Sequence, residues 1–288
     1  MATQFCKMHG LGNDFVFIDR RNDTTRLSAE QAAAIADRRL GVGCDQIIEI
    51  EQARDRQSAA AFMRIHNADG TPANICGNAA RCLADRLFAE SGAAEAVIDT
   101  AAGPLRAWRE ISGLIAVDMG MAKLSWQDVP LAREMDTAAL DLRLGPLSCP
   151  VAVGMGNPHA VFFVDKVDAV DLARLGPVIE RHSLFPERTN VEIVQVLDSG
   201  RLRMRVWERG AGITRACGSG ACAAGVAAAR RELAAHDVEV VLDGGSLRVC
   251  WQADGHVVLS GPVTYVFDGE LSDSLLGVAA KPVAERAA

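Results

Sequence analysis

Two segments far apart in the chain have nearly the same sequence, and this internal repeat limits the possible folds more than any other feature. Residues 10–19 read GLGNDFVFID and residues 154–165 read GMGNPHAVFFVD, so Asn13 matches Asn157. In both copies a G-x-G-N turn leads into an alternating apolar strand that closes on aspartate. A chain that repeats a unit of this kind is expected to build two similar halves.

The two copies stay in register further along the chain. After the first copy, residues 28–40 predict a helix with the capping-box pattern S-A-E-Q at its start, and a strand carrying Gln46 follows. After the second copy, residues 170–182 predict a helix, and a strand carrying Asn190 follows. In each copy 33 residues separate the leading asparagine from this second amide residue.

A cysteine marks the next matched position in each copy. Asn67 precedes Cys76 by nine residues, and Glu208 precedes Cys217 by nine residues. Each cysteine opens a C-G-[NS] step into a run of small residues that predicts a helix. Because unpaired N–H groups and the helix dipole favour negative charge there, we expect a lowered pKa and a reactive thiol at both positions.

The matched polar residues favour a binding site over a purely structural repeat. A cysteine in a small-residue run can pack as a small buried side chain. Asparagine, glutamine and glutamate at strand ends are harder to explain in that way, because burying them costs free energy unless they find partners. The pattern therefore predicts two facing halves that each contribute one thiol to a shared polar site.

Two thiols on opposite faces of a carbon atom can invert a stereocentre. One thiolate removes a proton while the other thiol delivers a proton from behind, which requires pKa values suited to proton transfer. The helix N-termini at Gly77-Asn78 and Gly218-Ser219 would direct N–H donors at a substrate carboxylate and stabilise the carbanion. If the thiols instead touched each other, they could form a redox disulfide.

Composition excludes several other classes of function. A net charge of −7 and a pI near 5.4 argue against nucleic acid binding, and no apolar stretch is long enough to predict a membrane span. We expect no cofactor and no metal, because the chain has no phosphate-binding loop, no C-x-x-C pair and only four lysines. The start of the chain lacks a signal-peptide pattern, so we expect a reducing cytoplasm. The arginines are assigned mostly to solvated helix faces.

Several spaced motifs together resemble the diaminopimelate epimerase family. They are KMHGLGNDFVFID, NADG with CGNAARC, GNPHAVFFVD, RTNVEI, WERGAG with ACGSGACA, and GPVTYVFDGE, which run from Lys7 to about Gly269. The resemblance implies an α+β fold of two pseudo-symmetric domains, each a curved, mainly antiparallel sheet wrapped round a central helix. It also implies a homodimer that needs no cofactor. We expect residues 1–118 with about 268–288 to form one domain and residues 119–267 the other, with the active site in the cleft between them.

The resemblance also implies roles for individual residues. Cys76 and Cys217 match the family's acid/base thiols, and His159 and Glu208 match residues thought to adjust their pKa values. The family's ligand-binding positions fall on Asn13, Gln46, Asn67, Gly77, Asn78, Asn157, Asn190, Glu208, Arg209, Gly218 and Ser219. The implied reaction converts LL-diaminopimelate to meso-diaminopimelate on the route to lysine and peptidoglycan. Arg209 can bind the distal carboxylate of that substrate in bidentate fashion.

The sequence departs from the family pattern at two positions. Ala79 stands where many members have glycine, and Ile213 stands where many have an acid. Neither is one of the ligand positions. Three alternatives remain to be tested: a related proline or hydroxyproline racemase, a redox protein in which the two cysteines form a disulfide, and an inactive binding module.

Overall fold

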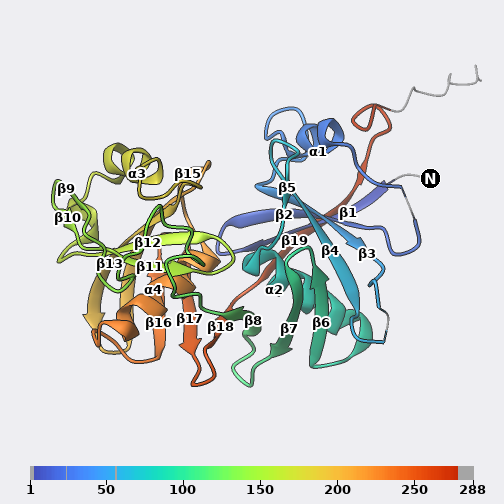
Figure 1. The fold of residues 1–288 in the computed structure, drawn as a ribbon. Coiled ribbons are helices and arrows are strands. Elements are labelled where there is room, and N and C mark those ends of the chain that lie inside the picture. The colour runs from blue at the N-terminus through green and yellow to red at the C-terminus, as the bar shows by residue number, and fades with distance from the viewer. Residues whose placement is uncertain (1–2, 24, 56, 278–288) are drawn as a thin grey trace, which may run out of the picture.

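The computed structural model describes residues 3–23, 25–55 and 57–277, and its elements follow the repeat (Figure 1). The first half contains β1 (Thr3–Gly10), β2 (Asn13–Asp19), α1 (Ala29–Ala36), β3 (Gln46–Glu51), β4 (Ala61–Asn67), β5 (Pro72–Ala73), α2 (Gly77–Ser91), β6 (Glu95–Thr100), β7 (Gly103–Arg109) and β8 (Ile115–Met121). A small ribbon of β9 (Arg143–Leu144) and β10 (Leu147–Ser148) precedes the second half. That half contains β11 (Val151–Gly154), β12 (Pro158–Phe163), the 3₁₀ helix η1 (Val167–Ala169), α3 (Leu172–Glu180), β13 (Asn190–Asp198), β14 (Arg201–Glu208), β15 (Gly212–Thr214), α4 (Gly218–Arg230), β16 (Asp237–Leu242), β17 (Gly245–Trp251) and β18 (His256–Gly261). The last strand is β19 (Thr264–Leu271).

The strands of the two halves pair in the same order. In the first half β1–β2, β3–β4, β6–β7 and β7–β8 are antiparallel, whereas β2–β3 and β4–β6 are parallel. In the second half β11–β12, β13–β14, β16–β17 and β17–β18 are antiparallel, whereas β12–β13 and β14–β16 are parallel. The predicted α+β fold of two pseudo-symmetric halves is thereby confirmed.

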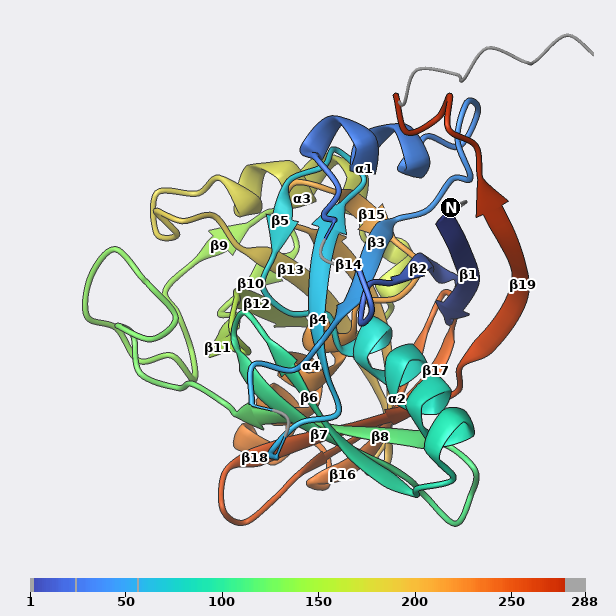
Figure 2. The same cartoon turned by 90° about the vertical axis from the view of Figure 1, so that its right-hand side faces the viewer.

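The register of the strands matches as closely as their order. Phe15 pairs with Gln46 across β2–β3, and His159 pairs with Asn190 across β12–β13. The two halves meet where β8 pairs with β18, and β19 returns to pair with β1 (Figure 2). Matched positions of the sequence repeat therefore occupy matched positions in space.

A helix of small residues lies inside the curve of each half. α2 packs against β1, β6, β7 and β8, and α4 packs against β11–β14 and β16–β18. Alanine and glycine predominate in α4, and a Cβ on Gly225 would lie 2.8 Å from Val249 Cγ1. Small side chains let the sheet close tightly round the helix, and one continuous apolar core runs through both halves.

α1 begins as predicted but ends earlier than predicted. Ser28 and Gln31 form the expected capping box, yet the helix stops at Ala36 rather than continuing to residue 40. The carboxylate of Asp37 accepts hydrogen bonds from the N–H groups of Arg39 and Leu40, each at 2.7 Å, and so stabilises a turn in place of the last helical residues.

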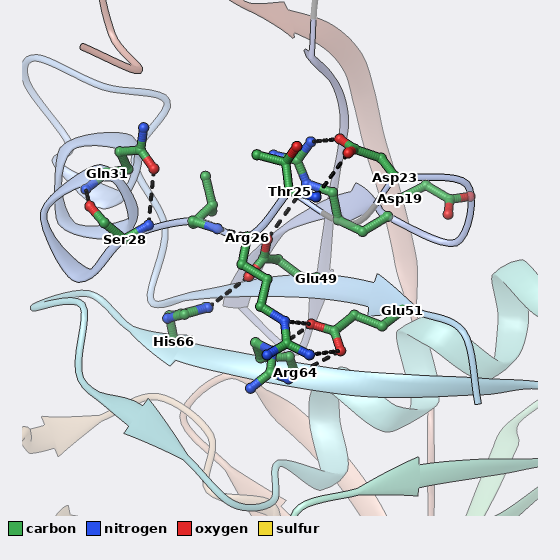
Figure 3. A network of polar contacts seen from close by, with 12 residues as sticks. Asp19, Asp23, Thr25, Arg26, Ser28, Gln31, Glu49, Glu51, Arg64 and His66 are labelled. Atoms are coloured by element: carbon green, nitrogen blue, oxygen red, sulfur yellow. Dashed lines mark hydrogen bonds and ion pairs between the residues drawn. The ribbon is translucent and has the colours of Figure 1, made fainter. Parts of the chain in front are cut away.

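A buried polar network fastens the segment before α1 to the sheet (Figure 3). The fully buried carboxylate of Glu49 accepts a hydrogen bond from Leu27 N at 3.1 Å, and its other oxygen lies 2.9 Å from His66 Nε2. Arg20 Nε lies 3.5 Å from the same carboxylate.

Among the described residues, no helix is both long and apolar enough to cross a membrane.

Candidate active site

The two predicted cysteines occupy the N-cap positions of the two central helices, and of the two only the Cys217 side chain accepts a capping hydrogen bond. Cys76 precedes α2 and Cys217 precedes α4, both with extended backbone. Cys217 Sγ accepts a hydrogen bond from Gly220 N at 3.4 Å and lies 3.6 Å from Ser219 Oγ. Cys76 Sγ lies 4.0 Å from Asn13 Oδ1. Cys217 is buried and Cys76 is half-buried, so both sulfur atoms sit within a protein environment.

The N-terminal ends of α2 and α4 meet, which places the two thiols in one region of the molecule. A Cβ on Gly77 would lie 3.2 Å from Leu259 Cδ2, and a Cβ on Gly218 would lie 3.0 Å from the same atom. The Gly218 position also faces Asn78 Oδ1 at 3.2 Å. The absence of a side chain at both positions therefore lets the two helix ends approach each other this closely.

In the first half the predicted ligand residues form short hydrogen-bonded chains. Gln46 Nε2 donates to Asn67 Oδ1 at 3.0 Å across the ends of β3 and β4. Asn78 Nδ2 donates to Asn13 Oδ1 at 3.0 Å, and Asn13 Nδ2 donates to Asp45 Oδ2 at 2.8 Å. Asn13, Gln46 and Asn67 are half-buried, which leaves part of each side chain accessible for a ligand.

In the second half the predicted residues form a similar set of contacts. Asn157 Nδ2 donates to Ser219 Oγ at 3.4 Å, and Asn157 Oδ1 lies 2.8 Å from His159 Nε2. Asn190 Oδ1 accepts a hydrogen bond from Arg209 N at 2.9 Å, which fixes the backbone at the start of the loop after β14. Arg209 is exposed, and its Nη1 donates a hydrogen bond to the carbonyl oxygen of Glu187 at 2.9 Å.

Glu208 lies close enough to both thiols to affect their ionisation, because its negative charge raises the pKa of Cys76 and of Cys217. The Thr214 hydroxyl donates a hydrogen bond to its carboxylate. Burial raises the pKa of Glu208 itself, while the Thr214 hydroxyl and the Cys217 thiol act against that rise. A carboxylate of the second half is thus shared by thiols from both halves.

The prediction that the helix N-termini lower the thiol pKa values is wrong for the ligand-free protein. Burial raises the pKa of Cys76 to about 11, although the N–H groups of Ala79 and Asn78 oppose this. Burial also raises the pKa of Cys217 well above its usual value, with the charges of Glu208 and Glu192 adding to the effect. Desolvation outweighs the helix dipole at both sites. Both thiols are therefore mainly protonated at neutral pH.

Two buried charged residues near the thiols were missed by the sequence analysis. Glu192 on β13 is fully buried, and its Oε1 lies 2.6 Å from His159 Nδ1. Arg81 on α2 is also fully buried, an exception to the expectation that the arginines mostly lie on solvated helix faces. Two features of the sequence could have revealed these residues. One is an acid at an inward-facing strand position in N-V-E-I, and the other is an arginine among small helical residues in A-A-R-C.

The other cysteines of the two central helices and the two positions that depart from the family pattern lie in different environments. Cys82 and Cys222 are fully buried in the core, as expected. Ala79 is fully buried within α2, whereas Ile213 on β15 is exposed. A surface pocket of about 660 Å³ is lined by Arg20, Arg21, Asn22, Asp23, Thr25, Arg26, Glu51 and Gln52, and it contains none of the predicted site residues.

Comparison with protein families finds one description over most of the chain. The sequence model described as diaminopimelate epimerase matches residues 5–125 and 151–266. A diaminopimelate epimerase from Rhodospirillum centenum is 55% identical over 276 residues, covering 96% of this chain and 94% of that protein. A diaminopimelate epimerase from Acidiphilium cryptum is 54% identical over 277 residues, covering 96% of this chain and 98% of that protein.

Solved structures share the fold at low sequence identity. A phenazine biosynthesis protein of the PhzF family from Bacillus anthracis superposes with a TM-score of 0.67 at 16% identity, covering 94% of this chain and 99% of that one. A hydroxyproline epimerase from Agrobacterium vitis with bound trans-4-hydroxy-L-proline superposes with a TM-score of 0.66 at 13% identity, covering 93% and 90%. These likenesses identify a shared architecture.

Proposed function

The chain belongs to the diaminopimelate epimerase family, and we propose that it interconverts LL- and meso-diaminopimelate by proton transfer between Cys76 and Cys217. It is an isomerase of lysine biosynthesis. The observation that supports the two-thiol assignment is the meeting of α2 and α4, because the cysteines at the N-cap positions of these helices both lie near the Glu208 carboxylate.

Each turnover moves one proton off the substrate and one proton onto it. The thiolate of one cysteine takes the α-proton and becomes a thiol, and the electron pair of the C–H bond stays on the α-carbon. The thiol of the other cysteine then protonates that carbon from the opposite face and becomes a thiolate. The α-carbon is inverted, no electron is gained or lost overall, and the reverse reaction uses the cysteines in exchanged roles.

The carbanion needs stabilisation, because an α-proton next to a carboxylate is a very weak acid. The first backbone N–H groups of α2 and α4 are unpaired within their helices, and we assign them to the reacting carboxylate. Negative charge growing on that carboxylate would be held by donors that are already in place. This arrangement requires neither a metal nor a cofactor.

The other end of diaminopimelate carries a second amino acid head, and two half-buried amides and one buried amide would recognise it. We assign Asn67, Asn157 and Asn190 to its polar groups and the exposed guanidinium of Arg209 to its carboxylate. Glu208 would then face a substrate ammonium group. A site built from such groups rejects a substrate that leaves them unpaired, which separates this enzyme from a proline racemase.

We further propose a homodimer formed through β19. Tyr265, Val266 and Phe267 are 56%, 46% and 45% exposed, so apolar side chains alternate on both faces of this strand and remain open to solvent. Val266→Glu should convert the dimer to a monomer in sedimentation velocity, whereas Val178→Glu on α3, where the valine is 50% exposed, should not. A Val266→Glu protein that sediments as a dimer would disprove this interface.

The domain division and location are also proposals. Residues 1–118 with about 268–288 would form one domain and residues 119–267 the other; the pairing of β19 with β1 supports this return of the chain. Residues 278–288 lie outside the described part. A reducing cytoplasm would keep both thiols available.

The deciding experiment uses reduced protein in D₂O without added cofactor. LL-diaminopimelate should yield meso product that carries deuterium at the inverted α-carbon, measured by chiral chromatography and mass spectrometry. trans-4-Hydroxy-L-proline and L-proline serve as control substrates and should not be inverted. Inversion of the controls alone would replace the assignment with a racemase, and inversion of diaminopimelate without deuterium entry would exclude exchangeable thiols as the proton donors.

A further inference from the structure

The guanidinium of Arg81 is buried directly behind the Cys76 helix end, and no carboxylate among the residues that the structure describes pairs with it. The residue is fully buried, and only its Nη2 donates a hydrogen bond, to Asn78 Oδ1 at 2.9 Å. Its Nε and Nη1 have no hydrogen-bond partner among the described residues. A Cβ on Gly10 would lie 3.1 Å from Nη2, and one on Gly261 would lie 3.3 Å from Nε, so two glycines leave room for the group.

Burying this group is costly, which requires an explanation. An arginine keeps its charge under ordinary conditions, and an unpaired buried charge costs several kcal/mol. Burial lowers the pKa of Arg81, and the ionisable groups near enough to oppose this are the thiols of Cys82, Cys76 and Cys222. Cys82 and Cys222 are fully buried in the core. Cys76 alone is half-buried and in contact with the predicted ligand residues.

A chain of hydrogen bonds connects Arg81 to the Cys76 sulfur. Asn78 Oδ1 accepts a hydrogen bond from Arg81, so the Nδ2 of Asn78 points away from Arg81. There it donates a hydrogen bond to Asn13 Oδ1 at 3.0 Å. That oxygen lies 4.0 Å from Cys76 Sγ. Arg81 therefore fixes the orientation of two amides beside the thiol as well as adding a positive charge behind it.

In the second half, the charged groups that face the thiol are negative, whereas Arg81 is positive. The position that matches Arg81 in the repeat is Cys222, which carries no charge. The groups facing Cys217 are the carboxylates of Glu208 and Glu192, the latter held by His159. Glu208 also faces Cys76, so the carboxylate shared by both thiols does not distinguish them, whereas Arg81 and Glu192 do.

We propose that Arg81 is a positioning residue that makes Cys76 the first of the two thiols to ionise. This inference deepens the proposed function, since it assigns the initial base of the two-thiol reaction. Arg81 acts through charge and through the Asn78–Asn13 contacts, and it touches no reacting atom.

The test measures thiol ionisation directly and uses no substrate, so its result is independent of whether the epimerase assignment holds. Ligand-free protein is treated with iodoacetamide at a series of pH values, and mass spectrometry gives the alkylation rate at each cysteine. In the wild-type protein the rate at Cys76 should rise at lower pH than the rate at Cys217. The reverse order would overturn the proposal without any variant.

Three variants separate charge from structure. Arg81→Met removes the charge at similar length and should slow Cys76 alkylation severalfold at a pH below the midpoint, since losing a nearby opposite charge raises the pKa of the thiol. Arg81→Lys keeps the charge and should retain the wild-type pH profile at Cys76, although it loses the planar fork. Cys82→Ala perturbs the same helix without changing charge and should leave the profile unchanged.

Each combination of results decides the proposal. A folded Arg81→Met protein with an unchanged Cys76 profile would overturn it, with near-ultraviolet circular dichroism establishing the fold. An Arg81→Lys protein that folds but shifts Cys76 as far as Arg81→Met does would also overturn it, because charge would then be irrelevant. If Arg81→Met does not fold, the wild-type order and the Arg81→Lys profile give the decision.

Discussion

Replacing Gly218 with alanine should force apart the N-terminal ends of α2 and α4. The added Cβ would lie 3.0 Å from Leu259 Cδ2 and 3.2 Å from Asn78 Oδ1, both closer than ordinary van der Waals contact. Overpacking of this kind costs about 1–3 kcal/mol. Alanine would otherwise favour the helix over glycine by up to about 1 kcal/mol. The cost of the close contact should outweigh the gain in helix propensity, so we expect a net loss of about 1 kcal/mol in the free energy of unfolding.

Urea unfolding and steady-state kinetics check this prediction together. A shift of a few tenths of an ångström at both helix ends should also lower kcat/KM about tenfold, because the proposed proton transfers depend on the positions of both thiols. Leu259→Ala removes the atom nearest to the new Cβ, so Gly218→Ala should cost less in that background. Gly200→Ala, whose Cβ would meet Asp198 Oδ1 at 3.6 Å, is the matched control and should change stability by less than about 0.5 kcal/mol. A Gly218→Ala protein more stable than wild type would refute the reasoning.

Three further predictions test the site and its frame. Cys76→Ser and Cys217→Ser should each keep the native circular dichroism spectrum and lose epimerisation by orders of magnitude, because a hydroxyl is a far poorer base at neutral pH; near-native turnover in either would disprove the two-thiol assignment. Because the pKa of Cys76 is raised to about 11, the thiolate fraction grows as pH rises, and kcat/KM should increase about tenfold per pH unit below that value; a profile flat from about pH 7 upward would contradict it. Glu49→Ala should lower the free energy of unfolding by about 3–5 kcal/mol in urea titration, since His66 and Arg20 lose their buried carboxylate, and a loss below about 1 kcal/mol would show that the network contributes little.

The elements of the fold could be predicted because their signals are local or repeated. The capping box at Ser28 and the small-residue runs after Cys76 and Cys217 mark where helices begin, and all three helices begin there. The matched spacing of Gln46 and Asn190 predicted equivalent strands, and both residues open a strand in the same register. Local backbone hydrogen bonding and apolar alternation suffice for predictions of this kind.

The ionisation of the thiols could not be predicted in the same way, because it depends on tertiary neighbours. The sequence shows that Cys217 begins a helix, but not that Glu192, 25 residues earlier in the chain, faces it from a buried strand. Nor does it show that Arg81 points inward beneath the helix end. Desolvation and distant charges act through space, and at both thiols they outweigh the helix dipole that the sequence does reveal.

The proposed two-thiol reaction would explain why a duplicated fold keeps its symmetry in the backbone and loses it in buried charge. Two facing thiols require two equivalent helix ends, which the repeat supplies. A two-base inversion nevertheless requires one thiolate and one thiol at the start of each turnover. Where the first half has Phe15, Ile48 and Arg81 at matched positions, the second has His159, Glu192 and Cys222. The histidine and the acid form a buried pair on the side of Cys217, and the Arg81 guanidinium lies on the side of Cys76. With identical surroundings neither thiol would ionise before the other, so in the proposed mechanism the divergence of these three positions distinguishes the two thiols.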